Sequence, residues 1–142
     1  MRSLGTQRMT VLSLRFRPLA ILSALLFFVI AVAWISVPAL MLASWGVDFN
    51  SSAGLVSRRS AALYAGVGVM FFLARNVAPS PARSSLMKGV VVTCMILATL
   101  GVGEFVAGHA NSGILLAAVL EVVLALAFLS VIRTDNRGRA GR

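Results

Sequence analysis

The stretch that decides the fold class runs from Pro18 to Ser44 and reads PLAILSALLFFVIAVAWISVPALMLAS. Within it, Leu19 to Ala43 form 25 consecutive residues without a charge. A helix needs about 20 apolar residues to cross roughly 30 Å of hydrocarbon. Because backbone polar groups in lipid must be satisfied within the segment, we predict a membrane-spanning helix here. Pro38 should bend this helix or mark its last turn.

A secretory signal peptide is the alternative for this first run, because Arg2, Arg8, Arg15 and Arg17 precede it. Signal peptides carry an apolar region of only about 7–15 residues, followed by a cleavage site of small residues. The uncharged run is longer than that, and no convincing cleavage site follows it. We therefore expect the run to be retained as a true span.

Three further apolar runs follow, at about 55–74, 89–108 and 113–132. The whole chain of 142 residues is 59% hydrophobic and 12% charged, with a mean hydropathy of +0.95. Soluble domains average about 45–50% apolar and 25% charged residues. The sequence therefore predicts an all-α integral membrane four-helix bundle over residues 18–132. A basic segment (1–17) precedes it, and a basic, disordered tail (133–142) follows it.

The basic residues predict the orientation of the bundle. The chain has 13 Lys and Arg against 4 acidic residues, a net charge of +9. If four spans alternate, 11 of the basic residues fall on one side, and Arg58 and Arg59 fall on the other. The positive-inside rule then places both termini in the cytoplasm. Because the charges flank apolar runs, we expect membrane lipids and not nucleic acid as partners, together with a second copy or another membrane protein.

The inventory of reactive side chains is small. The chain contains one cysteine, Cys94, and one histidine, His109. No intrachain disulfide, metal cluster or Cys/His catalytic pair can be assembled from them. We expect no metal and no cofactor, assign no catalytic residue, and interpret Cys94 as a core residue.

Counting residues from the basic ends of the runs places some polar side chains at matched depths. Arg59 lies 16 residues from Arg75, and Glu104 lies 16 residues from Lys88. At 1.5 Å per residue, both are about 24 Å from the cytoplasmic boundary. Trp34 belongs to the same layer. Two alternatives remain open for the arginines: Arg58 or Arg59 pairs with Glu104, or both extend outward to the headgroups.

A second layer is expected near the middle of the membrane, where the same count places Tyr64 and Glu121. A carboxyl there costs about 2.5–3.5 kcal/mol to insert, so Glu121 should face protein or water. Small residues at positions 113, 117 and 125 form a stripe with Glu121 on which another helix can approach closely. We expect Glu121 to be uncharged at neutral pH if it lacks a cationic partner, within reach of a hydrogen bond to Tyr64.

Three interpretations of the candidate residues Trp34, Arg58, Arg59, Tyr64, Glu104 and Glu121 stay open at this stage. In the first, the carboxyls join helices of a non-catalytic accessory or assembly component. In the second, they line a ligand-binding or proton-linked cavity, as in a small transporter. In the third, a glutamate acts as general acid or base on a lipid-like substrate, although no activated nucleophile supports an enzyme.

The chain also resembles a known group of membrane proteins. The segments that carry the resemblance are Pro38 with Trp45-Gly-Val-Asp48, Arg59 leading into Tyr64-Ala-Gly-Val-Gly-Val-Met70, and Leu73-Ala-Arg75. They are loosely similar to small uncharacterised bacterial four-helix membrane proteins of the DoxX-like kind. The resemblance implies an inner-membrane four-helix protein and supplies no catalytic residue.

Overall fold

The computed structural model describes residues 15–140, with side chains as far as residue 138. The described part is all-α and contains no strand. It has five helices, which are α1 (Phe16–Ser36), α2 (Pro38–Ser44), α3 (Ser51–Ala74), α4 (Pro81–Val106) and α5 (Gly113–Ala140).

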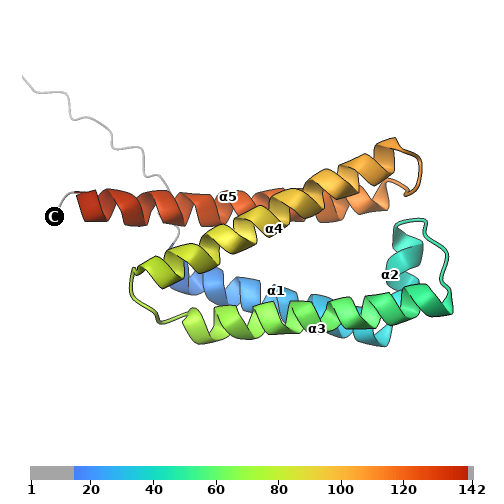
Figure 1. Cartoon of the computed structure of the whole chain (residues 1–142), viewed down its shortest axis with the longest axis horizontal. Helices are drawn as coiled ribbons and strands as arrows, with labels where there is room; N and C mark the ends of the chain where they lie inside the picture. The colour runs from blue at the N-terminus through green and yellow to red at the C-terminus, as the bar shows by residue number, and fades with distance from the viewer. Residues whose placement is uncertain (1–14, 141–142) are drawn as a thin grey trace, which may run out of the picture.

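The first predicted span is divided in two at Val37. This residue has φ −136° and ψ 51°, outside the helical region, and α2 then leaves the axis of α1 (Figure 1). Pro38 explains the break, because proline lacks an N–H and disfavours helical geometry in the residue before it. The expected effect of Pro38 is confirmed, but the single helix over 18–44 is wrong beyond Ser36.

The remaining helices are longer than the sequence predicted. The Asn50 side chain accepts a hydrogen bond from the Ala53 N–H at 2.8 Å, and Ser80 accepts one from the Arg83 N–H at 3.2 Å. These are N-caps, which satisfy amide groups that the first helical turn leaves free. They start α3 and α4 four and eight residues before the apolar runs at 55 and 89.

The C-terminal tail differs from the prediction of disorder. Residues 133–140 continue α5 as a helix, whereas 141–142 lie outside the described residues, as do residues 1–14 of the predicted N-terminal segment 1–17. The reason is tertiary: Asp135, one turn beyond the apolar run, forms an ion pair with Arg83 of α4. A polar composition alone does not reveal such an anchor.

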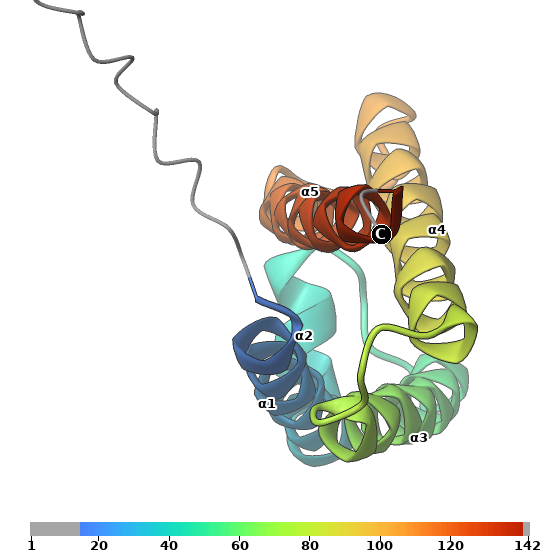
Figure 2. The same cartoon turned by 90° about the vertical axis from the view of Figure 1, so that its left-hand side faces the viewer.

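The long helices form two antiparallel pairs, α1 with α3 and α4 with α5 (Figures 1 and 2). Within each pair, small residues allow close approach. A Cβ on Gly68 of α3 would lie 3.3 Å from the Ala24 carbonyl oxygen of α1, and one on Gly101 of α4 would lie 3.6 Å from Ile114 of α5. Contacts between the pairs are far fewer than contacts within them.

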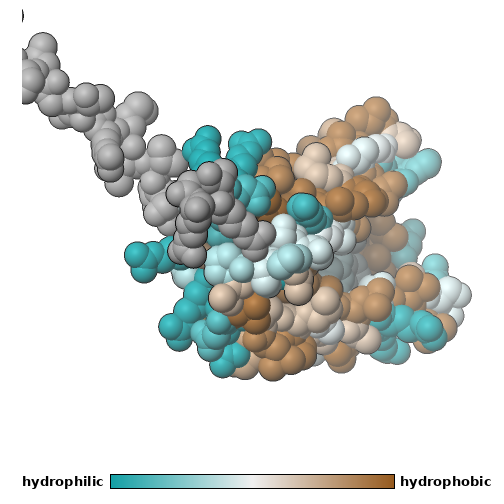
Figure 3. All heavy atoms as spheres, turned by 60° about the vertical axis from the view of Figure 1, so that its left-hand side comes forward, coloured by the Kyte–Doolittle hydropathy of each residue, from teal (hydrophilic) through white to brown (hydrophobic). Residues whose placement is uncertain are grey.

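The outer surface of the bundle is apolar, as brown patches on the space-filling view show (Figure 3). Large aliphatic side chains such as Leu22, Val29, Leu63 and Leu116 are more than 60% exposed. Three helices, α1, α4 and α5 to Gly138, are long and apolar enough to cross a membrane. The described helix α3 is not among them, because Arg58 and Arg59 interrupt its apolar sequence.

Candidate binding site between the helix pairs

The hydrophobic core joins the two pairs over only part of their length. The larger cluster draws on all four long helices and includes Phe27, Phe71, Cys94 and Phe128. The smaller cluster, centred on Trp34, contains residues of α1, α2, α3 and the loop after α2, and none of α4 or α5. Tyr64 packs against both clusters. Beyond Tyr64, therefore, the two pairs no longer share a core.

Exposure along the helices shows the same divergence. On α5, Ala125, Phe128 and Ile132 are buried, whereas Glu121 and Ala117, on the same helical face nearer the other end, are only half-buried. Side chains therefore do not fill the space in front of Glu121. Figure 3 shows the surface hollowed between the two pairs at the end away from the termini. We call this space the interpair cleft.

The shared core bounds the cleft on the side toward the chain termini, and Arg83 ties the helices together at that end of the bundle. Its guanidinium forms an ion pair with Asp135, donates a hydrogen bond to the Val77 carbonyl at 2.9 Å, and lies 4.6 Å from the centre of the Phe16 ring. It is only 8% exposed. A buried guanidinium held in this way ties α1, the α3–α4 loop, α4 and α5 together.

Helix α2 closes the opposite end. It crosses from the α1/α3 pair toward the α4–α5 turn (Figure 1), where the Asn111 N–H donates a hydrogen bond to the Trp45 carbonyl at 2.7 Å. Gly46 at φ 78° makes the turn that follows, a conformation that glycine adopts without strain. Gly113 is required for the approach, since a Cβ there would lie 1.9 Å from the Ser44 carbonyl oxygen.

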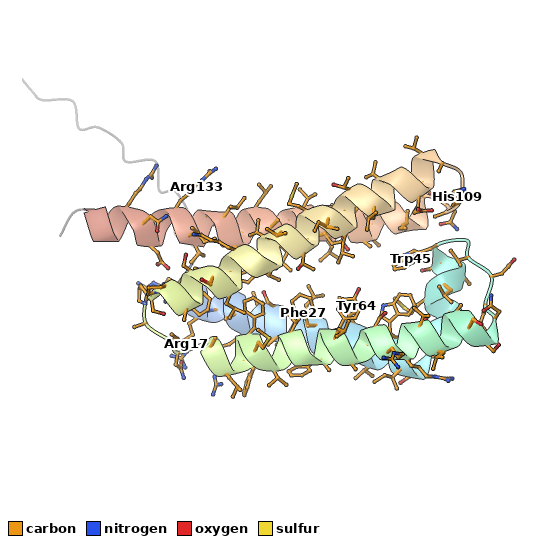
Figure 4. The ribbon with its side chains drawn as sticks, in the orientation of Figure 1. Arg17, Phe27, Trp45, Tyr64, His109 and Arg133 are labelled. Carbon is orange, nitrogen blue, oxygen red and sulfur yellow. The ribbon has the colours of Figure 1, made fainter. Side chains whose placement is uncertain are left out.

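Three side chains gather where the shared core ends and the cleft begins. Tyr64 of α3, Cys94 of α4 and Glu121 of α5 lie close enough for the Glu121 carboxyl to act electrostatically on the other two. Figure 4 shows Tyr64 directed from α3 toward the α4/α5 pair. Within the described side chains, Glu121 has neither an ion-pair partner nor a side-chain hydrogen bond.

A chain of aromatic rings runs through the shared core beneath the cleft. Tyr64 stacks on Phe27 at 6.3 Å between ring centres, Phe27 on Phe71 at 6.3 Å, and Phe71 contacts Phe128 at 5.0 Å. The chain of rings links α1, α3 and α5 through contacts of the offset type that aromatic side chains prefer. The half-buried Tyr64 is the ring of this chain nearest the cleft.

The structure brings together only part of the predicted site. Tyr64 and Glu121 lie within electrostatic range of each other, and no hydrogen bond joins them among the described side chains. Trp34 is buried against Trp45, with ring centres 5.2 Å apart, and packs in the same cluster as Tyr64. It supports the wall of the cleft near α2.

The predicted pairing of Glu104 with an arginine is not what the structure shows. Glu104 instead lies 2.9 Å from Nδ1 of His109 in the following turn, and both side chains are exposed. Arg58 and Arg59 are exposed on α3. Their exposure is compatible with the alternative expectation, in which both arginines extend outward to the headgroups. Matching depths set the height of a side chain in the membrane but not the side of the helix on which it lies.

Sequence reasoning missed two features of the site. Cys94 was interpreted as core filling, and it is buried, but it also borders Glu121. The Arg83–Asp135 pair was not foreseen because Asp135 lay in the segment predicted to be disordered. Its signal was an acidic residue in an otherwise basic stretch.

The arrangement offers a carboxyl, a phenol and a thiol next to a chain of aromatic rings, and no activated nucleophile. No group of three potential metal ligands occurs among residues 15–140. No protein-family model, curated protein or solved structure matches the chain. The DoxX-like resemblance therefore remains a prediction, and the site itself must carry the functional argument.

Proposed function

We propose that this chain is a small integral membrane protein that binds a small molecule in the interpair cleft without transforming it. The observation that carries the proposal is Glu121, a carboxyl in the middle of a membrane-spanning helix that faces incompletely filled space. Burial of an ionisable group in a membrane is costly, and such groups generally mark ligand or ion sites. Here the half-buried carboxyl has no ion-pair partner among the described side chains.

A purely structural role for Glu121 explains the geometry less well. Interhelical hydrogen bonds in membranes contribute about 0.6 kcal/mol on average, and they require a partner on another helix. Glu121 makes no side-chain hydrogen bond within the described residues. The half-buried Tyr64 makes no side-chain hydrogen bond to it either, which leaves both groups free to meet a ligand.

Proton-coupled transport of the same ligand is the second candidate. Glu121 favours it, because a carboxyl at the cleft can exchange a proton for a ligand. In this structure both ends of the cleft are closed, by the shared core with Arg83 behind it and by α2. Transport would therefore require the contact between Trp45 and Asn111 to open.

The first experiment is to extract the protein in native lipid discs and to measure the mass of the intact particle. We expect a small molecule bound to the wild type and lost from Glu121→Gln, but retained by the matched control Glu104→Gln. Binding that survives Glu121→Gln unchanged, or is absent from the wild type, would overturn the proposal. The same mass shows whether the partner is a second copy or a different subunit. A different subunit would correspond to the accessory role that the sequence also suggested.

For the topology, we propose four spans, α1, α3, α4 and α5, with both termini in the cytoplasm of a bacterial inner membrane. The arrangement of charges supports it. Arg17 and Arg133 lie at one end of the bundle and Trp45 and His109 at the other (Figure 4). The positive-inside rule assigns the arginine-rich end to the cytoplasm.

A further inference from the structure

We propose that the ligand is a lipophilic organic cation, which reaches Glu121 from the bilayer between α3 and α4. This inference rests on the proposed binding function and adds the chemical class of the ligand and its route. It follows from three independent observations: the charge balance of the cleft, the aromatic residues near it, and the places where the helices do and do not touch.

The charge balance selects a cation. The chain has four acidic residues, and two of them are paired within the described structure: Asp135 with Arg83, and Glu104 with His109. Asp48 lies exposed in the loop before α3. Glu121 is thus the acidic residue that faces the cleft, and the described basic side chains lie toward the helix ends, away from it. An anionic ligand would be repelled by the carboxylate, whereas a cation can take the place of the proton that an unpaired Glu121 is expected to hold and form an ion pair with it.

The aromatic residues near the cleft favour an organic cation over an inorganic one. Tyr64 is half-buried at the edge of the cleft and stacks on Phe27, and the indoles of Trp34 and Trp45 lie at the α2 end. Aromatic faces attract cations by about 0.5–2 kcal/mol, and they are the preferred surroundings of quaternary ammonium groups. A small metal ion would instead need several oxygen ligands.

The contacts between helices indicate the route. Arg83 with the shared core closes one end of the cleft, and α2 closes the other. On one side the backbones of α1 and α5 approach each other, whereas on the other side those of α3 and α4 hardly do, and beyond the shared core the surface between the two pairs is hollowed (Figure 3). The open side faces lipid if these helices span the membrane. A ligand that dissolves in the bilayer can use this opening, whereas a water-soluble ligand meets a closed structure at both ends.

The test uses tetraphenylphosphonium as the cation and triphenylphosphine oxide as a neutral probe of related shape. Binding of each is measured by equilibrium dialysis to the full-length protein in zwitterionic lipid discs, with empty discs subtracted. We expect the cation to bind the wild type and to bind Glu121→Gln about tenfold more weakly or less. Glu121→Asp should retain part of the affinity, and Glu104→Gln should retain all of it.

The outcomes separate the ligand class from the existence of the site. If both probes bind equally and Glu121→Gln changes neither, a cation-selective site is excluded while binding in the cleft stands. If neither probe binds the wild type and no small molecule accompanies it in native discs, the proposed binding function fails as well. Co-elution of Glu121→Gln with the wild type on size exclusion establishes that the variant is folded. If Glu121→Gln aggregates, the Glu121→Asp affinity and the neutral probe decide between the same outcomes.

Discussion

The proposed binding depends on Glu121, and the protonation state of its carboxyl should control the affinity for a cation. The titratable groups that face this carboxyl are Tyr64 from α3 and Cys94 from α4, while α1 offers none between Leu19 and Ser36. Among these, the carboxyl is the group that loses its charge on acidification. A bound cation and a proton therefore compete for the same oxygens.

This competition predicts the sign of the pH dependence. Affinity for tetraphenylphosphonium should rise with pH as the Glu121 carboxyl ionises, and it should fall as the pH is lowered and the carboxyl is neutralised. Dialysis over a range of pH checks the prediction. In Glu121→Gln the weak residual binding should not vary with pH. A slope of equal size in this variant would assign the titration to another group.

Arg83 is the residue on which the closed end of the bundle depends. Removing one partner of a buried ion pair typically costs about 3–5 kcal/mol, because the other charge remains buried and unpaired. Asp135 is 20% exposed, so water relieves part of this cost. We expect Arg83→Leu to lower the free energy of unfolding by about 3 kcal/mol.

The measurement is unfolding in mixed micelles, followed by tryptophan fluorescence. Arg137→Leu, an exposed arginine on the same helical extension as Asp135, is the matched control and should have little effect. Replacing both Arg83 and Asp135 by leucine should recover part of the loss. If Arg83→Leu and Arg137→Leu were equally stable, the pair would have no role in holding the helices.

At the scale of the elements, helix starts and breaks could be predicted only where a local signal exists. Pro38 marks the end of α1 because its effect on the backbone is local. The start of α3 also has a local signal, the Asn50 cap, but a prediction based on apolar runs alone does not include polar caps. The direction of α2 could not be predicted, because it depends on Gly113 and Asn111, more than 60 residues away.

Helix α2 should therefore be sensitive to a single methyl group. A Cβ on Gly113 would lie 1.9 Å from the backbone oxygen of Ser44, so Gly113→Ala must displace α2 from the α4–α5 turn. Gly89→Ala is the matched control, because nothing lies within 4 Å of its Cβ. Alanine at that site should be neutral or stabilising by up to about 1 kcal/mol.

The displacement can be followed through Trp45, which lies on the moving segment. We expect Gly113→Ala to expose this side chain and to increase its quenching by acrylamide, with no change in Gly89→Ala. If quenching is the same in both variants, α2 does not depend on this contact, and the closure of the cleft at this end must have another origin.

At the scale of the whole molecule, composition was sufficient to predict an all-α chain with helices apolar enough to cross a membrane, and residue counting predicts Tyr64 and Glu121 at one level. Neither could show that the helices pair as α1 with α3 and α4 with α5, nor that the pairs diverge. Those features depend on the side of each helix that carries small residues and on the Arg83–Asp135 pair. Axial position can be counted along the chain, whereas the facing direction emerges only from packing.

The number of spans is the remaining property of the whole molecule, and α3 decides it. Its 24 residues extend about 36 Å, which exceeds the hydrocarbon thickness. Residues 60–74 carry no charge, and Arg58 and Arg59 are exposed, where their long side chains can reach the headgroups. Its packing along α1 also commits it to the same depth, because two helices in contact over their length share one environment.

Labelling with a membrane-impermeant maleimide tests this topology in a Cys94→Ala background. Single cysteines are introduced at three exposed positions, as Asp48→Cys, Ala78→Cys and Asn136→Cys. With four spans and cytoplasmic termini, the thiol at position 48 should react in intact cells, and those at 78 and 136 only after permeabilisation.

If α3 does not cross, position 78 lies on the same side as position 48. Two crossings by α4 and α5 then return position 136 to that side as well, so all three thiols would react alike. Because the two topologies differ at two positions, one set of labelling reactions distinguishes them, and only the four-span result leaves the opening between α3 and α4 facing lipid.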